Sequence, residues 1–271
     1  MARRLPGRTM AACAVLMAVL AVGCKSTPPD AEPPPCPRAP RLAITDVGRA
    51  AYNSSAPCRA ELGRSVRGRP IEATVFEGAE PAVLVIGGIH GDESASAHLV
   101  EHLLVHLRVR PEDRAGRQIV LIPQANPDGL VVNTRYNRHG VDLNRNFPAG
   151  NFRASARNGQ APLSQPESRA VAAALERYRP SCIVSVHGPL NGIDPDGGRA
   201  SYELAQRMVA VSPVPLRDLP ALPGSLGSYA GKDLGLAMIT YELPDKRLPG
   251  RDPAAYLEQH LPALLLAIRE G

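Results

Sequence analysis

One stretch decides the fold of this 271-residue chain: residues 82–93 read Ala-Val-Leu-Val-Ile-Gly-Gly-Ile-His-Gly-Asp-Glu. The apolar run at 82–86 ends at two glycines, which predicts a buried strand followed by a tight loop. A helical pattern with its leucines on one face begins directly afterwards, over residues 94–108. His90 and Glu93 therefore lie in the loop at the carboxyl end of a central strand. Open α/β sheets place their functional sites at such ends.

Strand and helix patterns alternate along the rest of the chain. The sequence predicts further strands at 71–76, 119–123, 182–186 and 237–241, and further helices at 165–179, 201–211 and 253–269. In the last helix, Pro253 suits the first helical position after a cap at Asp252, whereas Pro262 should kink or split it. This alternation predicts an α/β fold, a three-layer sandwich around a central mixed, mostly parallel sheet.

Two more of the predicted strands end in a side chain that can bind a metal or act as a base. His187 and Glu242 each come directly after one of these strands. A catalytic zinc takes three protein ligands and keeps one position for water, and two histidines with one glutamate are a known set. We therefore expect His90, Glu93 and His187 to bind one zinc ion. Glu242 is then free to act as the general base, which takes a proton from the attacking water and returns it to the leaving nitrogen.

The segment between these strand ends is dense in arginine and asparagine. Residues 134–148 read Thr-Arg-Tyr-Asn-Arg-His-Gly-Val-Asp-Leu-Asn-Arg-Asn-Phe-Pro. An arginine can hold a carboxylate through two parallel hydrogen bonds, and an asparagine can add another. Asp142 in this segment is placed to orient a zinc-binding histidine through its second ring nitrogen. The segment therefore predicts a carboxylate-binding side of the site.

Together, these parts resemble the zinc carboxypeptidase family of the carboxypeptidase A type. The resemblance rests on His90-x-x-Glu93, on Gly-Val-Asp-Leu-Asn-Arg-Asn-Phe at 140–147, and on His187 and Glu242 in the family's order, with Asn-Pro-Asp-Gly at 126–129 also fitting. It covers nearly the whole folded part of the chain. It implies the family's fold, one zinc ion, and hydrolysis of an amide bond next to a free carboxylate.

The resemblance also implies roles for individual residues. Asn144 and Arg145 would hold the terminal carboxylate of the substrate, and Glu242 would be the base. Arg135 would stabilise the oxyanion, with Arg138 as the alternative for that role.

Within the family, the compact domain resembles the murein peptide amidase A subgroup. Members of that subgroup cut between γ-D-glutamate and meso-diaminopimelate in cell-wall peptides. The finer likeness lies in His-Gly-Pro-Leu at 187–190, Ile-Asp at 193–194 and Gly-Ser-Leu-Gly-Ser at 224–228. An amidase of that type is expected in the cytoplasm, whereas this chain begins with what reads as an export signal.

Two other functions stay open at the level of sequence. A deacylase of N-acyl amino acids, of the succinylglutamate desuccinylase and aspartoacylase type, would also use Asn144 and Arg145. The long match at 140–148 favours the carboxypeptidase function over the deacylase function. A catalytically inactive lipoprotein that binds wall peptides would keep the groove, but it would have no need of Glu242.

The amino-terminal part of the chain is typical of an exported, anchored protein. Residues 1–23 have three arginines and then an apolar run, which is shorter than the ~20 residues of a membrane-spanning helix and fits a secretory signal. Ala-Val-Gly-Cys at 21–24 resembles a bacterial lipobox, so we expect cleavage before Cys24 and a lipid on its sulfur; an ordinary signal peptide is the alternative.

Residues 24–41 form a proline-rich tether, and 42–271 the catalytic domain. We therefore expect a protein that is lipid-anchored to a membrane of the bacterial cell envelope and faces the periplasm or the exterior.

The net charge, the lack of Trp and the cysteine content indicate which classes of partner the protein can bind. Loss of residues 1–23 removes three arginines and no acid, which lowers the net charge from +5 to +2, too little to argue for nucleic acid. There is no Trp, which disfavours a base-stacking surface. We expect a peptide or muropeptide substrate, a membrane contact through the lipid, no nucleic acid, and a monomer. Cys36 and Cys58 could pair in an oxidising envelope or stay free, and Cys182 should be a small core residue.

Several other polar residues fit structural roles. The histidines at 98–106 match another zinc motif, but they lie off the leucine face of their helix and should be solvated. His139 and His260 are expected at the surface. Asp194 and Asp196 could contact a substrate ammonium, but their Gly- and Asp-rich segment fits a turn better.

Overall fold

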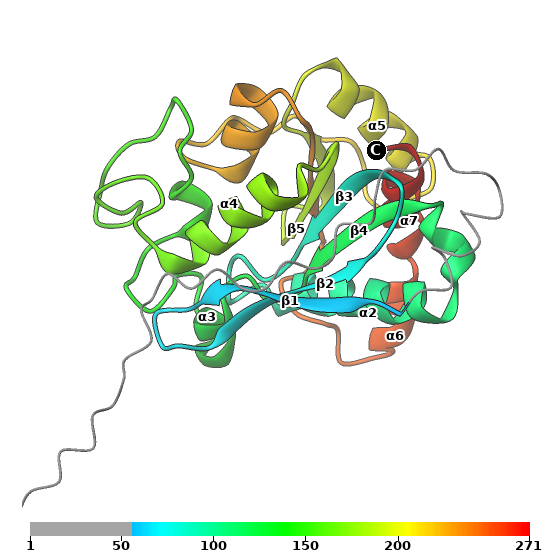
Figure 1. The fold of residues 1–271 in the computed structure, drawn as a ribbon, viewed down its shortest axis with the longest axis horizontal. Coiled ribbons are helices and arrows are strands. Elements are labelled where there is room, and N and C mark those ends of the chain that lie inside the picture. Colours follow the sequence, from blue (N-terminus) through cyan, green and yellow to red (C-terminus); the bar gives the residue numbers. More distant parts are fainter. Residues whose placement is uncertain (1–55) are drawn as a thin grey trace, which may run out of the picture. The chain divides into compact units, whose positions relative to one another are not determined.

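The computed structural model describes residues 56–271, which contain a seven-stranded mixed sheet with helices on both faces (Figure 1). The strands are β1 (Cys58–Arg64), β2 (Pro70–Phe76), β3 (Glu80–Ile86), β4 (Arg117–Ile122), β5 (Cys182–His187), β6 (Gly192–Pro195) and β7 (Ala237–Glu242). The α-helices are α2 (Ser94–Val109), α3 (Pro127–Val132), α4 (Pro166–Tyr178), α5 (Arg199–Val209), α6 (Pro253–Glu258) and α7 (Leu261–Glu270). Short 3-10 helices, η1 (Pro111–Arg114) and η2 (Leu143–Arg145), and a π-helix, η3 (Gly227–Asp233), complete the set.

The sheet order is β1-β2-β4-β3-β5-β7-β6. The four middle strands run parallel, while β1, β2 and β6 join in antiparallel fashion. On β3, Val83 and Val85 belong to one core and Leu84 and Ile86 to the other, since successive side chains of a strand point to opposite faces. Both faces are covered, which explains why the run at 82–86 is apolar throughout instead of alternating.

Helices form a layer on each side of the sheet (Figure 1). Residues of α2, α5, α6 and α7 share one core with one face of the sheet, and α4 and η3 contribute to the second core on the opposite face. The predicted three-layer α/β sandwich with a mixed, mostly parallel sheet is confirmed.

Most predicted elements are present with small shifts at their ends. The last helix breaks into α6 and α7 before Pro262, and the Asp252 carboxylate caps α6 by accepting a hydrogen bond of 3.0 Å from the amide of Ala255. The sequence patterns missed β1, β6, α3 and the short helices η1, η2 and η3. β1 is an edge strand with charged residues, β6 has only four residues, and η3 contains two glycines.

The prediction that His260 lies at the surface is wrong, because His260 is fully buried at the junction between α6 and α7. Its Nδ1 lies 2.8 Å from the Tyr241 hydroxyl, and its ring packs edge-on against Tyr241 and Tyr256. Burial lowers the pKa of His260 to about 4, so the ring is neutral at physiological pH. His139 is exposed, as expected.

The histidines at 98–106 do not come together as a metal site. His98 is exposed, whereas His102 and His106 are half-buried and each pair with a different carboxylate, that of Glu258 and that of Asp113.

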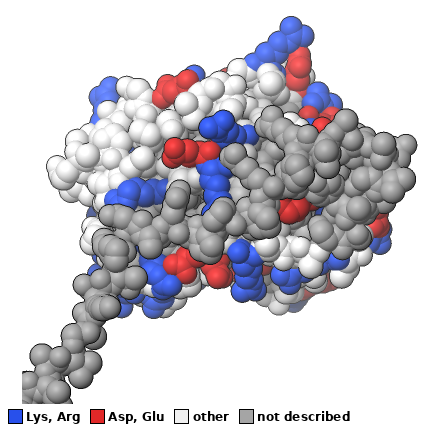
Figure 2. Space-filling view, viewed as in Figure 1, with Lys and Arg blue, Asp and Glu red and all other residues white. Residues whose placement is uncertain are grey.

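The predictions for the amino terminus, namely the signal peptide at 1–23, the tether at 24–41, Cys24 and Cys36, lie outside the described residues. Cys58 is disulfide-bonded, and Cys182 is a free, buried core residue as predicted. No helix between residues 56 and 271 has the length and apolar character needed to cross a membrane. On the face shown in Figure 2, basic and acidic side chains are interspersed.

Candidate active site

The sheet topology brings the predicted site residues to one edge. β3, β5 and β7 are neighbouring parallel strands, so their carboxyl ends lie side by side. His90 and Glu93 lie in the loop after β3, while His187 and Glu242 are the last residues of β5 and β7. His187 and Glu242 face each other directly in the register of the two strands. Rigid strand ends therefore position His187 and Glu242, and the loop after β3 brings His90 and Glu93 to them.

The loop between β3 and α2 depends on glycine. Gly88 has a φ of +63°, in the left-handed region that favours glycine. A Cβ on Gly91 would lie 2.0 Å from the carbonyl carbon of Gly129, so only glycine lets this loop pack against α3. The Ser96 hydroxyl accepts a hydrogen bond from the amide of Gly88 and donates one to the carbonyl of Glu93. These contacts fix Glu93 at the start of α2.

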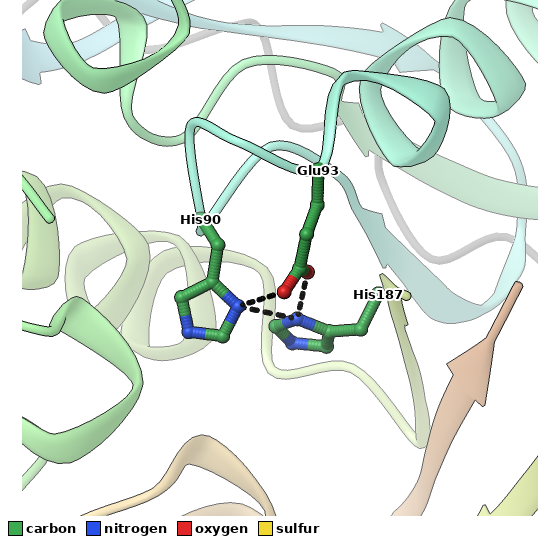
Figure 3. A group of neighbouring side chains, drawn as sticks. All are labelled: His90, Glu93 and His187. Carbon is green, nitrogen blue, oxygen red and sulfur yellow. Dashed lines mark hydrogen bonds and ion pairs between the residues drawn. The ribbon is translucent and has the colours of Figure 1, made fainter. Parts of the chain in front are cut away.

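Three potential ligands converge in the interior of this edge (Figure 3). The Nδ1 atom of His90 lies 2.9 Å from Oε1 of Glu93, and the Nδ1 atom of His187 lies 3.0 Å from Oε2. The two Nδ1 atoms are 3.1 Å apart. One ligand atom from each residue lies within 4.8 Å of the others, and all three side chains are buried. These are the three residues that the sequence predicts as metal ligands.

The second nitrogen of each histidine ring has its own partner. Nε2 of His90 lies 3.1 Å from Oδ1 of Asp142, and Nε2 of His187 lies 3.0 Å from the Ser185 hydroxyl. When Nε2 carries the proton and donates it to these partners, Nδ1 of each ring presents a lone pair to Glu93. Two lone pairs and a carboxylate facing one another in a buried space repel unless a proton or a metal cation lies among them. The set of two nitrogens and a carboxylate fits zinc.

The ionisable side chains of the cluster shift one another's pKa values. Burial opposes ionisation of Glu93, but His90 and His187 outweigh it and hold the pKa of Glu93 well below its usual range. Burial likewise opposes ionisation of Asp142, yet His90 and Arg135 hold its pKa low. Burial lowers the pKa of His90, but the two carboxylates raise it more strongly. Both carboxylates are therefore charged at neutral pH and attract a cation.

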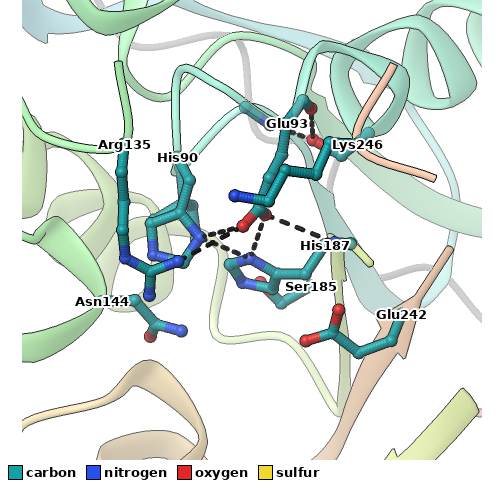
Figure 4. Close-up of polar contacts among 12 residues, drawn as sticks. His90, Glu93, Arg135, Asn144, Ser185, His187, Glu242 and Lys246 are labelled. Carbon is teal, nitrogen blue, oxygen red and sulfur yellow. Dashed lines mark hydrogen bonds and ion pairs between the residues drawn. The ribbon is translucent and has the colours of Figure 1, made fainter. Parts of the chain in front are cut away.

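Of the two arginines considered for the oxyanion role, Arg135 lies in the site (Figure 4). Its Nε donates a hydrogen bond of 2.9 Å to Asp142, and its Nη1 one of 3.4 Å to Glu93. Arg138 is exposed. The structure therefore places Arg135, and not Arg138, beside the predicted metal ligands.

The predicted carboxylate-binding pair lies on the same side as Arg135. Asn144 and Arg145 belong to η2, and its N-cap residue, Asp142, accepts a hydrogen bond of 3.0 Å from the amide of Asn144. The side-chain oxygen of Asn144 accepts a hydrogen bond of 2.8 Å from the amide of Leu226, and its NH₂ group has no acceptor among residues 56–271. Burial lowers the pKa of Arg145 more than the nearby Asp142 carboxylate raises it, and the charge of Arg135 lowers it too. Two cations close enough to influence each other attract an anionic group of a substrate.

Glu242 stands opposite these groups and has a different environment. It is 7% exposed, and its Oε2 accepts a hydrogen bond of 3.3 Å from the amide of Leu190. Burial raises the pKa of Glu242, and the charge of Glu93 adds to this effect. In Figure 4 its side chain extends from β7 beside His187. A carboxylate with a raised pKa at this place suits proton transfer.

Sequence patterns missed some contacts of the site. Ser185 lies two residues before His187, so the strand periodicity puts both side chains on one face. That spacing could have identified Ser185 as a partner of His187. The ion pair of 2.5 Å between Lys246 and Asp92 ties the segment after β7 to the loop after β3. Nothing in the local sequence of either residue indicates this pairing.

Comparison with known proteins agrees with this geometry. Residues 50–192 match the sequence profile of zinc carboxypeptidases. The chain belongs to the zinc carboxypeptidase family. Murein peptide amidase A of Escherichia coli K12 is 34% identical over 221 residues, which is 72% of this chain and 85% of that protein. Murein peptide amidase A of Vibrio campbellii is 30% identical over 203 residues, covering 67% of this chain and 77% of that protein.

Solved structures of zinc carboxypeptidases share the fold. The crystal structure of a murein-tripeptide amidase from Escherichia coli O157 superposes with a TM-score of 0.61 at 30% identity, covering 81% of this chain and 95% of that one. Thrombin activatable fibrinolysis inhibitor superposes with a TM-score of 0.68 at 20% identity, over 83% and 73% of the two chains. The predicted family is confirmed, and membership makes the chain a metallopeptidase or amidase.

The Asp142→Asn variant tests whether the Asp142 carboxylate strengthens zinc binding by orienting His90. The amide cannot bear the charge that orients His90, so we expect zinc affinity to fall about 10- to 100-fold, as is typical when the carboxylate behind a metal-binding histidine is lost. Competition with a chromophoric chelator measures it. Asp113→Asn, which removes the carboxylate paired with His106 at 2.8 Å, is the matched control and should keep wild-type affinity. Equal zinc affinities for the two variants would contradict the role of Asp142.

Proposed function

We propose that this zinc carboxypeptidase hydrolyses the amide bond before a residue with a free carboxylate in murein peptides, at the γ-D-glutamyl-diaminopimelate bond. The strongest support is the meeting of His90, Glu93 and His187 with Glu242 at one sheet edge, beside Asn144. The choice of murein peptides rests on the relatives named murein peptide amidase A, which match over most of their length.

We propose that His90, Glu93 and His187 hold one zinc ion. Zinc bound there would supply Lewis-acid chemistry, polarising a carbonyl and lowering the pKa of a water molecule. Asp142 and Ser185 keep both Nδ1 lone pairs directed inward by occupying the Nε2 positions.

The protein's own side chains carry the proton and hold the charges. Glu242 accepts a proton from the attacking water and passes it to the leaving nitrogen, and its raised pKa makes it a better proton acceptor than an ordinary glutamate. Arg135 donates hydrogen bonds to the oxyanion that forms on the carbonyl. Asn144 and Arg145 bind the free carboxylate, which fixes the scissile bond between Glu242 and Arg135.

A defined substrate panel tests the proposed reaction. The purified chain, loaded with zinc, is incubated with γ-D-glutamyl-meso-diaminopimelate peptides, ordinary dipeptides and N-acyl amino acids, with and without a chelator. We expect chelator-sensitive release of meso-diaminopimelate. Faster cleavage of N-acyl amino acids would instead favour the deacylase, and peptide binding without turnover would favour the inactive wall-binding lipoprotein.

Glu242→Gln separates chemistry from metal binding. The amide keeps the shape of the side chain but cannot accept the proton, so we expect activity to fall by about 10²- to 10⁴-fold while zinc content is unchanged. Steady-state kinetics and metal analysis of the same preparation measure both quantities. Turnover close to that of the wild type would remove Glu242 as the base.

Arg145→Ala tests recognition of the free carboxylate. Loss of a charged hydrogen bond should raise KM for peptides with a free terminus about tenfold or more, and should leave amidated peptides, which are poor substrates, nearly unchanged. Arg138→Ala, at an exposed position, is the control. A similar loss on free and amidated peptides would show that Arg145 does not bind the carboxylate.

We also propose that the protein is tethered to a membrane of the cell envelope through a lipid on Cys24, on the basis of the lipobox-like Ala-Val-Gly-Cys at 21–24. Metabolic labelling with a fatty-acid analogue followed by membrane fractionation tests this. We expect label on the wild type and none on Cys24→Ala. A Cys24→Ala protein that still carries the label would contradict the anchor.

A further inference from the structure

One lysine lies beside the metal-ligand cluster and has no part in the proposed mechanism. Lys246 belongs to the segment that follows β7, four residues after Glu242. Its Nζ atom lies 2.5 Å from Oδ2 of Asp92, and its carbonyl oxygen accepts a hydrogen bond of 3.0 Å from the amide of Ala95. Asp92 and Ala95 lie on either side of Glu93 in the sequence. Lys246 is therefore held against the loop that carries a predicted metal ligand.

The segment that carries Lys246 borders the active site. The amide of Leu243 donates a hydrogen bond of 2.8 Å to the carbonyl oxygen of His187. A Cβ on Gly188 would lie 2.9 Å from the carbonyl oxygen of Asp245. The segment after β7 therefore packs closely over the end of β5, where one of the predicted metal ligands lies.

Lys246 and the proposed carboxylate-binding pair lie on different sides of the metal-ligand cluster. In Figure 4 the Lys246 side chain extends beside Glu93, whereas Asn144 lies on the other side of the histidines. We have proposed that Asn144 and Arg145 bind the free carboxylate of the leaving residue. The acyl part of the substrate then extends away from them across the cluster, toward Lys246.

The ion pair of Asp92 and Lys246 lies within electrostatic reach of Arg135. Burial lowers the pKa of Arg135, but nearby carboxylates, first that of Asp142, raise it more. The Asp92 carboxylate is one of them. Exposed charges are largely screened from each other beyond about 10 Å at 0.1 M salt. Asp92 and the lysine bonded to it therefore lie near the group proposed to stabilise the oxyanion.

The ammonium group is the part of this ion pair that a ligand can reach. The side chain of Lys246 is 39% exposed and that of Asp92 is 21% exposed. Oδ1 of Asp92 is enclosed by the protein, and no residue between 56 and 271 donates a hydrogen bond to it. An ammonium group has three N–H donors, and among the same residues only Asp92 accepts from Lys246. Lys246 can therefore donate to a ligand while Asp92 keeps it in place.

The acyl residue of the proposed substrate carries an anion on this side. A γ-linked D-glutamyl residue keeps its α-carboxylate free, with two methylene groups and the α-carbon between that group and the scissile carbonyl. In an ordinary peptide the α-carboxyl group is itself the scissile carbonyl, so an acyl residue with an uncharged side chain presents no anion there. A cation beside the acyl residue therefore favours γ-glutamyl substrates.

We propose that Lys246, positioned by Asp92, binds the free α-carboxylate of the γ-glutamyl residue on the acyl side of the scissile bond. The inference rests on the proposed function and adds the origin of its selectivity for γ-linked acyl residues. Lys246 contacts the substrate and takes no part in proton transfer, so it determines specificity. Asp92 acts through Lys246 and is a positioning residue.

Two substrates that differ in one group test the assignment: L-alanyl-γ-D-glutamyl-meso-diaminopimelate and its α-carboxamide, L-alanyl-γ-D-isoglutaminyl-meso-diaminopimelate. The carboxamide keeps the size of the carboxylate and removes its charge. Lys246→Met removes the cation, and Lys246→Arg keeps it. Arg247→Met, at the next position and exposed, removes one positive charge from the same segment and is the control. The ratio of kcat/KM for the two substrates is measured in each preparation, so differences in zinc loading cancel.

We expect the wild type to favour the carboxylate substrate about tenfold or more in kcat/KM, because only that substrate accepts a charged hydrogen bond from Lys246. Lys246→Met should lower kcat/KM about tenfold for the carboxylate substrate and less than about twofold for the carboxamide. Lys246→Arg and Arg247→Met should keep most of the preference. An equal loss on both substrates by Lys246→Met would overturn the assignment, because a lysine that only ties two loops together predicts that result.

Calorimetric titration with the acyl-side products tests the site without turnover. L-Alanyl-D-glutamate and L-alanyl-D-isoglutamine differ only at the α-carboxyl group, and both carry the γ-carboxylate that hydrolysis frees. We expect the wild type to bind the first about tenfold more tightly and Lys246→Met to bind both alike. Equal affinities in the wild type would overturn the assignment even where γ-D-glutamyl bonds are cut. If the preference is present but these bonds are not cut, the proposed reaction fails and the assignment of Lys246 stands.

Discussion

Two imidazole nitrogens and a carboxylate face one another at about 3 Å among buried side chains, and the arrangement of the surrounding residues depends on this contact. Such a cluster is costly to bury unless protons or a cation lie between its members. Asp142 and Ser185 occupy the outer nitrogens of the two rings, so the inner nitrogens are left to bind a cation. The network that holds His90 and His187 in place therefore also directs their inner nitrogens toward the place where we propose a metal ion.

Two glutamates near the ends of the central parallel strands have different environments and therefore different roles. Glu93 lies between the histidines and has a pKa held low, whereas Glu242 lies one strand away and has a raised pKa through burial. Environments that push the pKa values of two carboxylates apart are how acid, base and binding roles are divided in active sites.

The sequence was informative where the physics is local or periodic. The apolar run at 82–86, the helix periodicities and the strand-end positions of His187 and Glu242 follow from patterns of two and 3.6 residues. β6 and η3 did not follow, because a four-residue strand and a π-helix that contains two glycines leave no periodic pattern in the sequence. His260 was misplaced for the same reason, since the break between α6 and α7 turns it inward. The order of motifs indicated the catalytic edge, and only the fold showed what lies next to it.

Anomalous diffraction at the zinc absorption edge, from crystals of the purified protein grown without added metal chelator, tests whether His90, Glu93 and His187 bind zinc. We expect one strong peak, about 2.1 Å from Nδ1 of His90 and Nδ1 of His187 and in contact with the Glu93 carboxylate. A peak bound to the Nε2 atoms, a peak among the histidines at 98–106, or a fully ordered site with no peak after zinc soaking would contradict it.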